Sequence, residues 1–370
     1  MKFSDSIFRS ILELRAKNHV QLVNGIQASS DTVLIIATLF LGDLFMLAPF
    51  IASLRKSNPK VKIILVCRNE LKEMASILEV EHVIPSLKPT RASIKKINTL
   101  SGNNIDTAYC VFSGRWLPAM IDIPVRRVVS FPEPANRWNH LITQTVDFPV
   151  VAMPAIKIPL LMLDKECINE DLVAFDKWSP VGETAIIHVG ARSEARRMPI
   201  DLVAYIVNIL DRFGVNIVIS AGPDEFNNYK NLISLIPINT FNRIIFELGS
   251  KSLYELVPTI ISANIVVGID TGVLHLSKAL GVPTLVLMGQ SQIELFGGDN
   301  HYSRSIHLGV GNLTCRDKKT FQGLSQNWIN RCDRSNCPIE GVPCLGNMSR
   351  NLIDSSIHEL LKLSLNIAPS

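Results

Sequence analysis

The chain has 370 residues and a formal net charge of +4, with 47% hydrophobic and 19% charged residues. This composition indicates a globular protein with large buried sheets, and the length predicts two domains, because single hydrophobic cores stop growing near ~250–300 residues. The mild charge, without a dense Lys and Arg stripe, argues against a nucleic-acid-binding protein but permits an anionic substrate or a membrane-surface acceptor.

Residues 1–31 are predicted to form a helical N-terminal extension. Their charges are scattered and no apolar core segment lies among them, which argues against a secretory signal. The spacing of the apolar residues instead predicts an amphipathic helix. One side of this helix carries Ile7, Ile11, Leu12 and Leu14.

Residues 32–54 contain a single charge, Asp43, so hydropathy alone makes them a candidate membrane span. A carboxylate near the centre of a span costs roughly 2.5–3.5 kcal/mol. The β-branched residues of 32–36 also favour a strand, followed by a separate helix over 44–55. We favour a soluble segment here and keep a membrane-anchored protein as an alternative.

Strands and helices alternate along the chain, with a proline-rich break over residues 132–178. The predicted strands are 32–38, 61–67, 82–84, 106–112, 126–131, 184–189, 215–220, 265–267 and 282–288. The predicted helices are 44–56, 70–78, 93–100, 201–213, 253–263, 273–280 and 353–365. Such alternation is typical of parallel sheets with helices on both faces. We expect an α/β protein of two doubly wound, Rossmann-like domains facing a central cleft, over 32–175 and 176–350, with a C-terminal helix in 351–370.

In doubly wound sheets, ligands bind at the carboxyl ends of the strands. The corresponding loops are predicted at residues 39–43, 113–115, 190–199, 221–225 and 270–275. The chain has no G-x-G-x-x-G after the first strand of either half and no Walker A sequence, which argues against a nicotinamide dehydrogenase and a P-loop ATPase. It also lacks a G-x-S-x-G nucleophile elbow, which weakens a hydrolase interpretation.

The stretch ANIVVGIDTGVLHLSKALGVPTLVLMGQ, residues 263–290, reads as strand, tight turn, helix and strand. Backbone N–H groups and the positive end of the helix dipole at such a turn form a common anion-binding site. Asp270, Thr271, Gly272 and His275 all lie near the turn. The alternative is a purely structural turn with a capped helix.

Three segments now resemble one family: TLFLGDL after the first strand, HVGARSEARRMP after the first strand of the second half, and DTGxxH before ALGVPTLVLMG. Together they are similar to the ADP-heptose:lipopolysaccharide heptosyltransferases, glycosyltransferase family nine of GT-B fold. The resemblance covers residues 32–361. It implies inverting transfer of heptose from ADP-heptose to an anionic glycolipid or oligosaccharide acceptor in lipopolysaccharide biosynthesis. No cofactor is implied, and the expected location is the cytoplasm, with peripheral contact at the inner membrane.

The resemblance assigns catalytic roles to two residues. Asp43, after Gly42, matches the aspartate proposed as general base for the acceptor hydroxyl, although an aspartate before a helix can also be an N-cap. Arg196 stands where the family usually has a lysine that neutralises the leaving diphosphate, and Met198 replaces an aromatic residue. Arginine retains the charge with a different geometry. Arg192 is an alternative in the same loop, and the whole loop could instead be a solvated basic segment.

The same resemblance places the donor at the turn described above. The N–H groups of Thr271 and Gly272 would hold the diphosphate, His275 would add a hydrogen bond or a positive charge, and Asp270 would bind sugar hydroxyls. A structural histidine is the alternative for His275. In the 221–225 loop, the donor-binding candidates are Gly222, Asp224 and Glu225, with one of the two acids on the ribose.

Four C-terminal cysteines form a second candidate cluster: Cys315, Cys332, Cys337 and Cys344. Their spacing lacks the tight C-x₂-C pairs of a structural zinc site, so we predict no metal centre, but reduced thiols, a metal site and disulfides all remain open. Six basic residues could meet an anionic acceptor or be ordinary surface charge: Arg91, Lys95, Lys96, Arg115, Arg126 and Arg127. Two functional alternatives are a GT-B transferase that uses another sugar or a protein acceptor, and a catalytically silent GT-B-like binding module.

Overall fold

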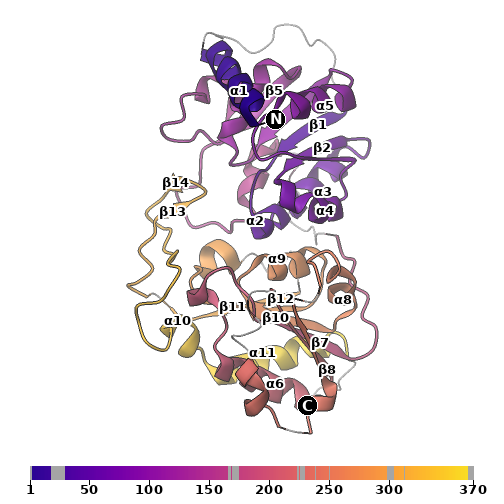
Figure 1. Cartoon of the computed structure of the whole chain (residues 1–370), viewed down its shortest axis with the longest axis vertical. Coiled ribbons are helices and arrows are strands. Elements are labelled where there is room, and N and C mark those ends of the chain that lie inside the picture. The colour runs from indigo at the N-terminus through magenta and orange to yellow at the C-terminus, as the bar shows by residue number, and fades with distance from the viewer. Residues whose placement is uncertain are drawn as a thin grey trace. The chain divides into compact units, whose positions relative to one another are not determined.

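The computed structural model describes residues 2–17, 30–165, 168, 175–222, 225, 230–237, 239–249, 251–297, 304–311 and 313–365. The chain forms two compact units, each built on one six-stranded parallel sheet (Figure 1). Unit 1 comprises Met1–Val151, Lys157–Asn169 and Thr320–Gln326. Unit 2 comprises Ala152–Ile156, Glu170–Lys319 and Asn327–Ser370.

The sheet of unit 1 has the strand order β3-β2-β1-β4-β5-β6, with all neighbours parallel. Its strands are β1 (Thr32–Ile36), β2 (Lys62–Cys67), β3 (His82–Pro85), β4 (Ile105–Cys110), β5 (Val125–Ser130) and β6 (Gln144–Thr145). All five residues of β1 are buried, because helices cover both faces of the sheet. A strand buried on both faces is apolar along its length. This is one reason why residues 32–54, which begin with β1, have the hydropathy of a membrane span.

The helices of unit 1 divide between the two faces of its sheet. One face is covered by α1 (Lys2–Lys17), α5 (Arg91–Ser101) and the 3₁₀ segment η3 (Gly114–Ile121), which share a hydrophobic core. On the other face lies α3 (Ala48–Ser57), whose Phe50 makes an edge-to-face contact with Tyr109 of β4 at 5.1 Å between ring centroids. The short helices are α2 (Leu41–Phe45) and α4 (Lys72–Ala75).

The predicted N-terminal helix is present, but only part of its apolar side packs on unit 1. Leu12 is 1% exposed and belongs to the core. By contrast, Ile7, Ile11 and Leu14 are 50%, 51% and 63% exposed. They recur at helical spacing, so α1 presents an apolar stripe on its outer surface.

Residues 32–54 do not form one long helix. They contain β1, α2 and most of α3, and among the described residues no helix is long and apolar enough to cross a membrane. The single predicted helix 44–56 is wrong at its start, since a turn at Met46 and Leu47 separates α2 from α3. Pro49 explains the restart, because proline is well tolerated in the first turn of a helix and breaks one further in.

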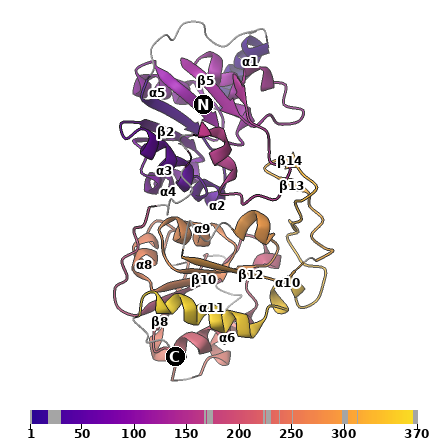
Figure 2. The same ribbon diagram turned by 180° about the vertical axis from the view of Figure 1, so that it is seen from behind.

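The sheet of unit 2 repeats the same topology, with the order β12-β11-β10-β7-β8-β9 and parallel neighbours. Its strands are β7 (Thr184–His188), β8 (Asn216–Ala221), β9 (Ile244–Leu248), β10 (Ile265–Ile269), β11 (Thr284–Met288) and β12 (Ser305–Gly309). One face is covered by α6 (Ile200–Arg212) and α11 (Arg350–Lys362), and the other by α8 (Val257–Ser262) and α9 (Gly272–Ala279), as Figures 1 and 2 show. A short helix, α10 (Pro343–Gly346), precedes α11.

A small hairpin, β13 (Thr320–Phe321) and β14 (Leu324–Ser325), is present that the sequence pattern did not predict. Its turn residues Gln322 and Gly323 have φ values of +50° and +84°, the left-handed region that a tight hairpin turn requires. The hairpin belongs to unit 1, although the chain on either side of it belongs to unit 2. Phe321 anchors it, with ring centroids 5.5 Å from Phe112 and 6.4 Å from Phe148.

Candidate active site

Both sheets reverse their strand order at one place, between β1 and β4 in unit 1 and between β7 and β10 in unit 2. The loops that leave two such strands run in opposite directions and open a crevice at the carboxyl edge, where doubly wound proteins bind ligands. The predicted site residues that the structure describes follow the carboxyl ends of strands β1, β7, β8 and β10, either in loops or in the first turns of the helices after them.

In unit 2, the turn between β10 and α9 is held close to its neighbours. A Cβ at Gly268 would lie 2.7 Å from the carbonyl oxygen of His188, so glycine allows β10 to lie against β7. Thr271 is the N-cap of α9 but its side chain makes no capping hydrogen bond. The Thr271 Oγ1 atom is buried and has no hydrogen-bond partner among the described residues. The amino end of this eight-residue helix is therefore not closed by its own cap side chain.

Arg196 reaches this turn from the loop after β7. It ends the 3₁₀ segment η7 (Glu194–Arg196), and its guanidinium donates to the backbone carbonyl of Asp270. Its Nη2 atom also lies 3.9 Å from Asp270 Oδ2, while the Arg196 side chain remains 37% exposed. The structure thus brings together residues 74 positions apart in the sequence. Arg192, in the same loop, is exposed.

Asp270 is the centre of this cluster. His275 Nε2 lies 2.9 Å from Asp270 Oδ1, both side chains are 7% exposed, and the Ser291 hydroxyl donates to Asp270 Oδ2. Burial favours the neutral acid, yet His275, Arg196 and Ser291 together hold the pKa of Asp270 well below its usual range. Burial, aided by the charge of Lys278, lowers the pKa of His275. Asp270 is therefore ionised and engaged by its own neighbours.

Glu225 joins the loops after β7 and β8. Its buried carboxylate accepts hydrogen bonds from the N–H groups of Ala191, at 2.7 Å, and Gly222, at 2.8 Å, and lies 3.4 Å from Arg197 Nε. A Cβ at Gly190 would overlap this carboxylate, which explains the glycine there. The arrangement stabilises both loops and keeps Gly222 at the carboxyl edge.

The other acid predicted for the ribose, Asp224, lies outside the described residues. The choice between Asp224 and Glu225 therefore stays a prediction. The contacts of Glu225 show that its two oxygens already serve backbone groups of two loops.

In unit 1, Asp43 is the third residue of α2 and is half-buried. The N-cap of α2 is Phe40 and that of α3 is Leu47, so Asp43 caps neither helix. Gly42 precedes it in the same helical turn, and its carbonyl accepts from Met46. The carboxylate thus sits just after the carboxyl end of β1.

The loops after β1 and β4 are tied together by Ser113. The Ser113 hydroxyl accepts from the N–H of Thr38 at 3.0 Å and donates to the carbonyl of Val111 at 3.0 Å. Phe40 is 44% exposed, and the guanidinium of Arg68 lies 4.1 Å from its ring centroid. This edge of unit 1 therefore offers a carboxylate, hydroxyl groups and an exposed aromatic ring.

The six basic candidates of unit 1 separate into two groups. Arg126 and Arg127 lie at the amino end of β5, away from the carboxyl edge, and pair with Asp106 and Asp164 at 2.6 and 3.3 Å. The others are exposed and lie nearer that edge: Arg115, which follows β4, and three residues of α5, Arg91, Lys95 and Lys96. An acceptor at the carboxyl edge would meet the second group first.

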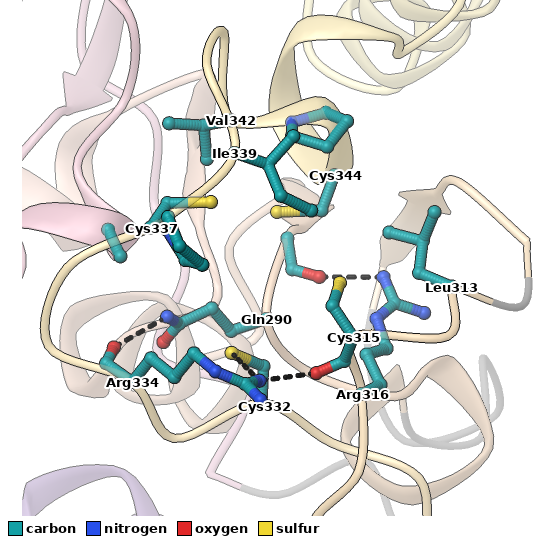
Figure 3. A pocket seen from close by; sticks show the side chains of 14 residues that line it. Gln290, Leu313, Cys315, Arg316, Cys332, Arg334, Cys337, Ile339, Val342 and Cys344 are labelled. Carbon is teal, nitrogen blue, oxygen red and sulfur yellow. Dashed lines mark hydrogen bonds between the residues drawn. The ribbon is translucent and has the colours of Figure 1, made fainter.

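The four C-terminal cysteines line one pocket in unit 2, as Figure 3 shows. Each is a free thiol in this structure. Burial raises the pKa of Cys344 to about 11, against the opposing charge of Arg316. Ala195, the residue before Arg196, also lines the pocket, so the thiols lie behind the Arg196 loop.

The cysteine pocket also holds two guanidinium groups. Arg316 donates to the carbonyl of Gly289 at 2.6 Å, and Arg334 donates to the carbonyl of Cys315 and approaches Cys332 Sγ at 3.6 Å. Across the described ranges, no group of three or more His, Cys, Asp or Glu side chains is arranged to hold a metal ion. The role of the thiols stays open between the alternatives given above.

Two features of the unit 2 site were missed in the sequence. Ser291 follows the carboxyl end of β11, the neighbour of β10, so extending the strand-end rule to β11 would have found it. Lys278 lies in the middle of an apolar helix pattern, and its 6% exposure identifies it only in the folded structure. A lysine so deeply buried is unusual and indicates a specific environment.

The fold and site define an α/β protein with two doubly wound units and a cluster of charged and polar side chains at the switch point of the second unit. A family model, "Glycosyltransferase family 9 (heptosyltransferase)", matches residues 130–325, slightly more than half of the chain. The chain therefore belongs to glycosyltransferase family 9, and the recognition made from its motifs is confirmed.

Similar proteins agree with this assignment. A putative glycosyltransferase of Haemophilus influenzae is 25% identical over 295 residues, which cover 69% of this chain and 81% of the relative. Among solved structures, E. coli ADP-heptose lipopolysaccharide heptosyltransferase II has a TM-score of 0.68 at 16% identity, over 91% of this chain and all of that one. E. coli heptosyltransferase WaaC, solved with ADP, has a TM-score of 0.63 at 17% identity, over 89% of this chain and 99% of that one. The predicted GT-B fold class is confirmed.

Proposed function

We propose that the protein transfers heptose, by an inverting displacement, from ADP-heptose bound in unit 2 to an acceptor bound in unit 1. One observation carries the donor half of this proposal. Arg196 and His275 meet at Asp270, at the switch point of a doubly wound sheet and beside the amino end of α9. A cation and a helix amino end at one turn fit a diphosphate better than they fit a neutral ligand.

In the proposed reaction, the leaving diphosphate gains negative charge as the glycosidic bond breaks. The guanidinium of Arg196 has five N–H donors, and its contact with the Asp270 carbonyl orients it while leaving donors for phosphate oxygens. The helix dipole of α9 adds positive potential at the same place. Stabilisation of developing charge by groups held in place is commonly the largest contribution to catalysis.

Asp43 is proposed as the general base. A sugar hydroxyl is a poor nucleophile until its proton can leave, and a carboxylate at the carboxyl edge of unit 1 can accept it. Attack by that hydroxyl on the anomeric carbon displaces the nucleoside diphosphate and inverts the configuration.

The proposed donor and acceptor follow the family and its solved members. One neighbour was solved with ADP and another is named for ADP-heptose and lipopolysaccharide. We infer that the acceptor is an anionic glycolipid or oligosaccharide, such as the lipopolysaccharide core. The exposed residues Arg91 and Arg115 near the carboxyl edge of unit 1 suit its negative charge.

We also infer that the protein works at the cytoplasmic surface of the inner membrane when its acceptor is a glycolipid. The exposed stripe of Ile7, Ile11 and Leu14 on α1 is the surface that would enter the interfacial region. Sedimentation with vesicles that contain anionic lipid tests this. Binding by the wild type and its loss in Ile11→Glu are expected, and equal sedimentation of both proteins would contradict the inference.

The donor is tested by titrating the full chain with ADP, UDP and GDP in a calorimeter. Binding of ADP alone is expected. Tighter binding of UDP or GDP would favour a GT-B transferase for another sugar, and binding of none would support a silent GT-B-like module. Incubation with ADP-heptose and a core oligosaccharide then tests transfer, with release of ADP and a larger product as the expected result.

A further inference from the structure

Lys278 is a buried cation in the second half of α9, close behind the proposed donor turn. It is 6% exposed, and its neighbours Ala279 and Leu280 along the helix are buried and apolar. An ammonium group in such surroundings is costly unless other groups compensate its charge. The groups that compensate the charge of Lys278 therefore indicate the role of this lysine.

The ionisable groups that face Lys278 come from three elements. Its Nζ atom lies 3.4 Å from His307 Nε2 on β12. His275 precedes it by one helical turn on α9, and Asp270 stands at the end of β10, where its charge favours the ammonium form. Beyond Asp270 lies Arg196. These five side chains are called the polar row of unit 2 below: Lys278, His307, His275, Asp270 and Arg196.

We propose that Lys278 is a positioning residue for the donor diphosphate, a buried cation beneath the turn that balances Asp270 and keeps the turn electropositive. The inference rests on the proposed donor site. Without this ammonium, the carboxylate of Asp270 would cancel the charge of Arg196, and only the helix dipole would attract the diphosphate. With it, the row holds one net positive charge, since burial keeps both His275 and His307 neutral.

The charge of Lys278 depends on pH in the range that a binding experiment can reach. Burial lowers the pKa of Lys278 to about 8, with Asp270 opposing the shift. The ammonium is therefore present below pH 8 and is lost as the pH rises above it. Diphosphate affinity should fall over the same interval.

The test compares the wild type with Lys278→Met, which keeps a similar volume and removes the charge. Lys362→Met, at the exposed end of α11, is the matched control. ADP and adenosine are titrated into each full-length protein at pH 7 and pH 9.5. Lys278→Met should bind ADP about tenfold more weakly at pH 7, as expected for the loss of one nearby charge, with adenosine binding unchanged.

Wild type and Lys362→Met should lose about tenfold in ADP affinity between pH 7 and pH 9.5, whereas Lys278→Met should not. If the wild type binds ADP and Lys278→Met matches it at both pH values, the inference is wrong while the donor site stands. Equal losses of ADP and adenosine would show a merely structural lysine. If the variant does not fold, a flat wild-type profile between pH 7 and pH 9.5 overturns the inference. If the wild type binds no nucleoside diphosphate, the donor site fails as well.

Discussion

The two units share one strand order and one switch point, yet their carboxyl edges differ in chemistry. The edge of unit 1 has the hydroxyl groups of Thr38 and Ser113, which contact each other, and the half-buried Asp43. The edge of unit 2 has a buried carboxylate, Asp270, contacted by His275 and Arg196. The comparison shows that the sheet supplies the position and the loops supply the chemistry, so one topology can serve as an acceptor half and a donor half.

Their histidines show the same contrast. Burial lowers the pKa of His188 to about 4 and of His307 to about 3, and both lie in unit 2 with His275. In unit 1, His82 and His140 are exposed. The imidazoles of His188, His275 and His307 in unit 2 are thus kept neutral by burial, whereas His82 and His140 of unit 1 lie at the surface.

The substitution Asp43→Asn is the strongest test of whether the two carboxyl edges have different functions. The amide cannot accept the proton of the acceptor hydroxyl, so the transfer rate should fall by roughly 10²–10⁴-fold. Calorimetric affinity for ADP should be unchanged, because donor binding is assigned to unit 2. An unaltered rate would remove Asp43 from catalysis, and a parallel loss of ADP affinity would show that the division between the units is wrong.

Acid should destabilise unit 2 before unit 1. In the unfolded chain, His188 has its ordinary pKa of 6.5, whereas burial in the folded chain lowers this pKa to about 4. The unfolded state therefore binds a proton first as the pH falls, and the stability that is present above pH 6.5 is lost between pH 6.5 and pH 4. For His188 alone the loss is about 3 kcal/mol. Scanning calorimetry from pH 7 to pH 4, with limited proteolysis to identify the unfolding unit, measures it. Earlier unfolding of unit 1 would contradict the contrast.

Arg196→Met tests the donor edge directly. Removing the guanidinium should weaken ADP binding about 10–100-fold, while Arg196→Lys should recover part of the affinity by restoring the charge without the planar fork. Arg212→Met, which changes an exposed arginine on α6 paired with Asp354, is the matched control and should bind as the wild type does. If calorimetry gives Arg196→Met the same ADP affinity as the wild type, the diphosphate must bind elsewhere.

A substitution in the β13–β14 hairpin should have the smallest effect of the four, a change in the unfolding free energy of unit 1. Phe321 is 4% exposed and contacts Phe112 and Phe148, so Phe321→Leu removes aromatic contacts at nearly constant apolarity. We expect a loss of about 1 kcal/mol in the unfolding free energy of unit 1, read from urea titration, with unit 2 unaffected. Phe246→Leu, in β9 of unit 2, is the reciprocal control. A shift in unit 2 for Phe321→Leu would contradict the assignment of the hairpin to unit 1.

The strand–helix alternation could be predicted because it depends on local periodicity. Apolar runs such as Thr32–Ile36 and Ile265–Ile269 are buried on both sides and appear in the structure as β1 and β10. The weaker strand Ile244–Leu248 was missed, since Glu247 interrupts its apolar run and none of its residues is fully buried. Parallel sheets place strand ends at one edge, so the candidate loops followed from the order of elements alone.

By itself the sequence determined the fold class, the family motifs and the strand ends after which Asp43, Arg196 and Asp270 follow. Only the tertiary structure decided which side chains meet. It joined Ser291 to Asp270 and Lys278 to His307, gathered four cysteines around one pocket, and placed Phe321 in unit 1. The physical reason is that the periodicity of apolar residues shows which side of a helix or strand is buried, but not which other element covers that side. Contacts between distant elements depend on how whole sheets and helices pack, and so do the pKa shifts that follow from burial.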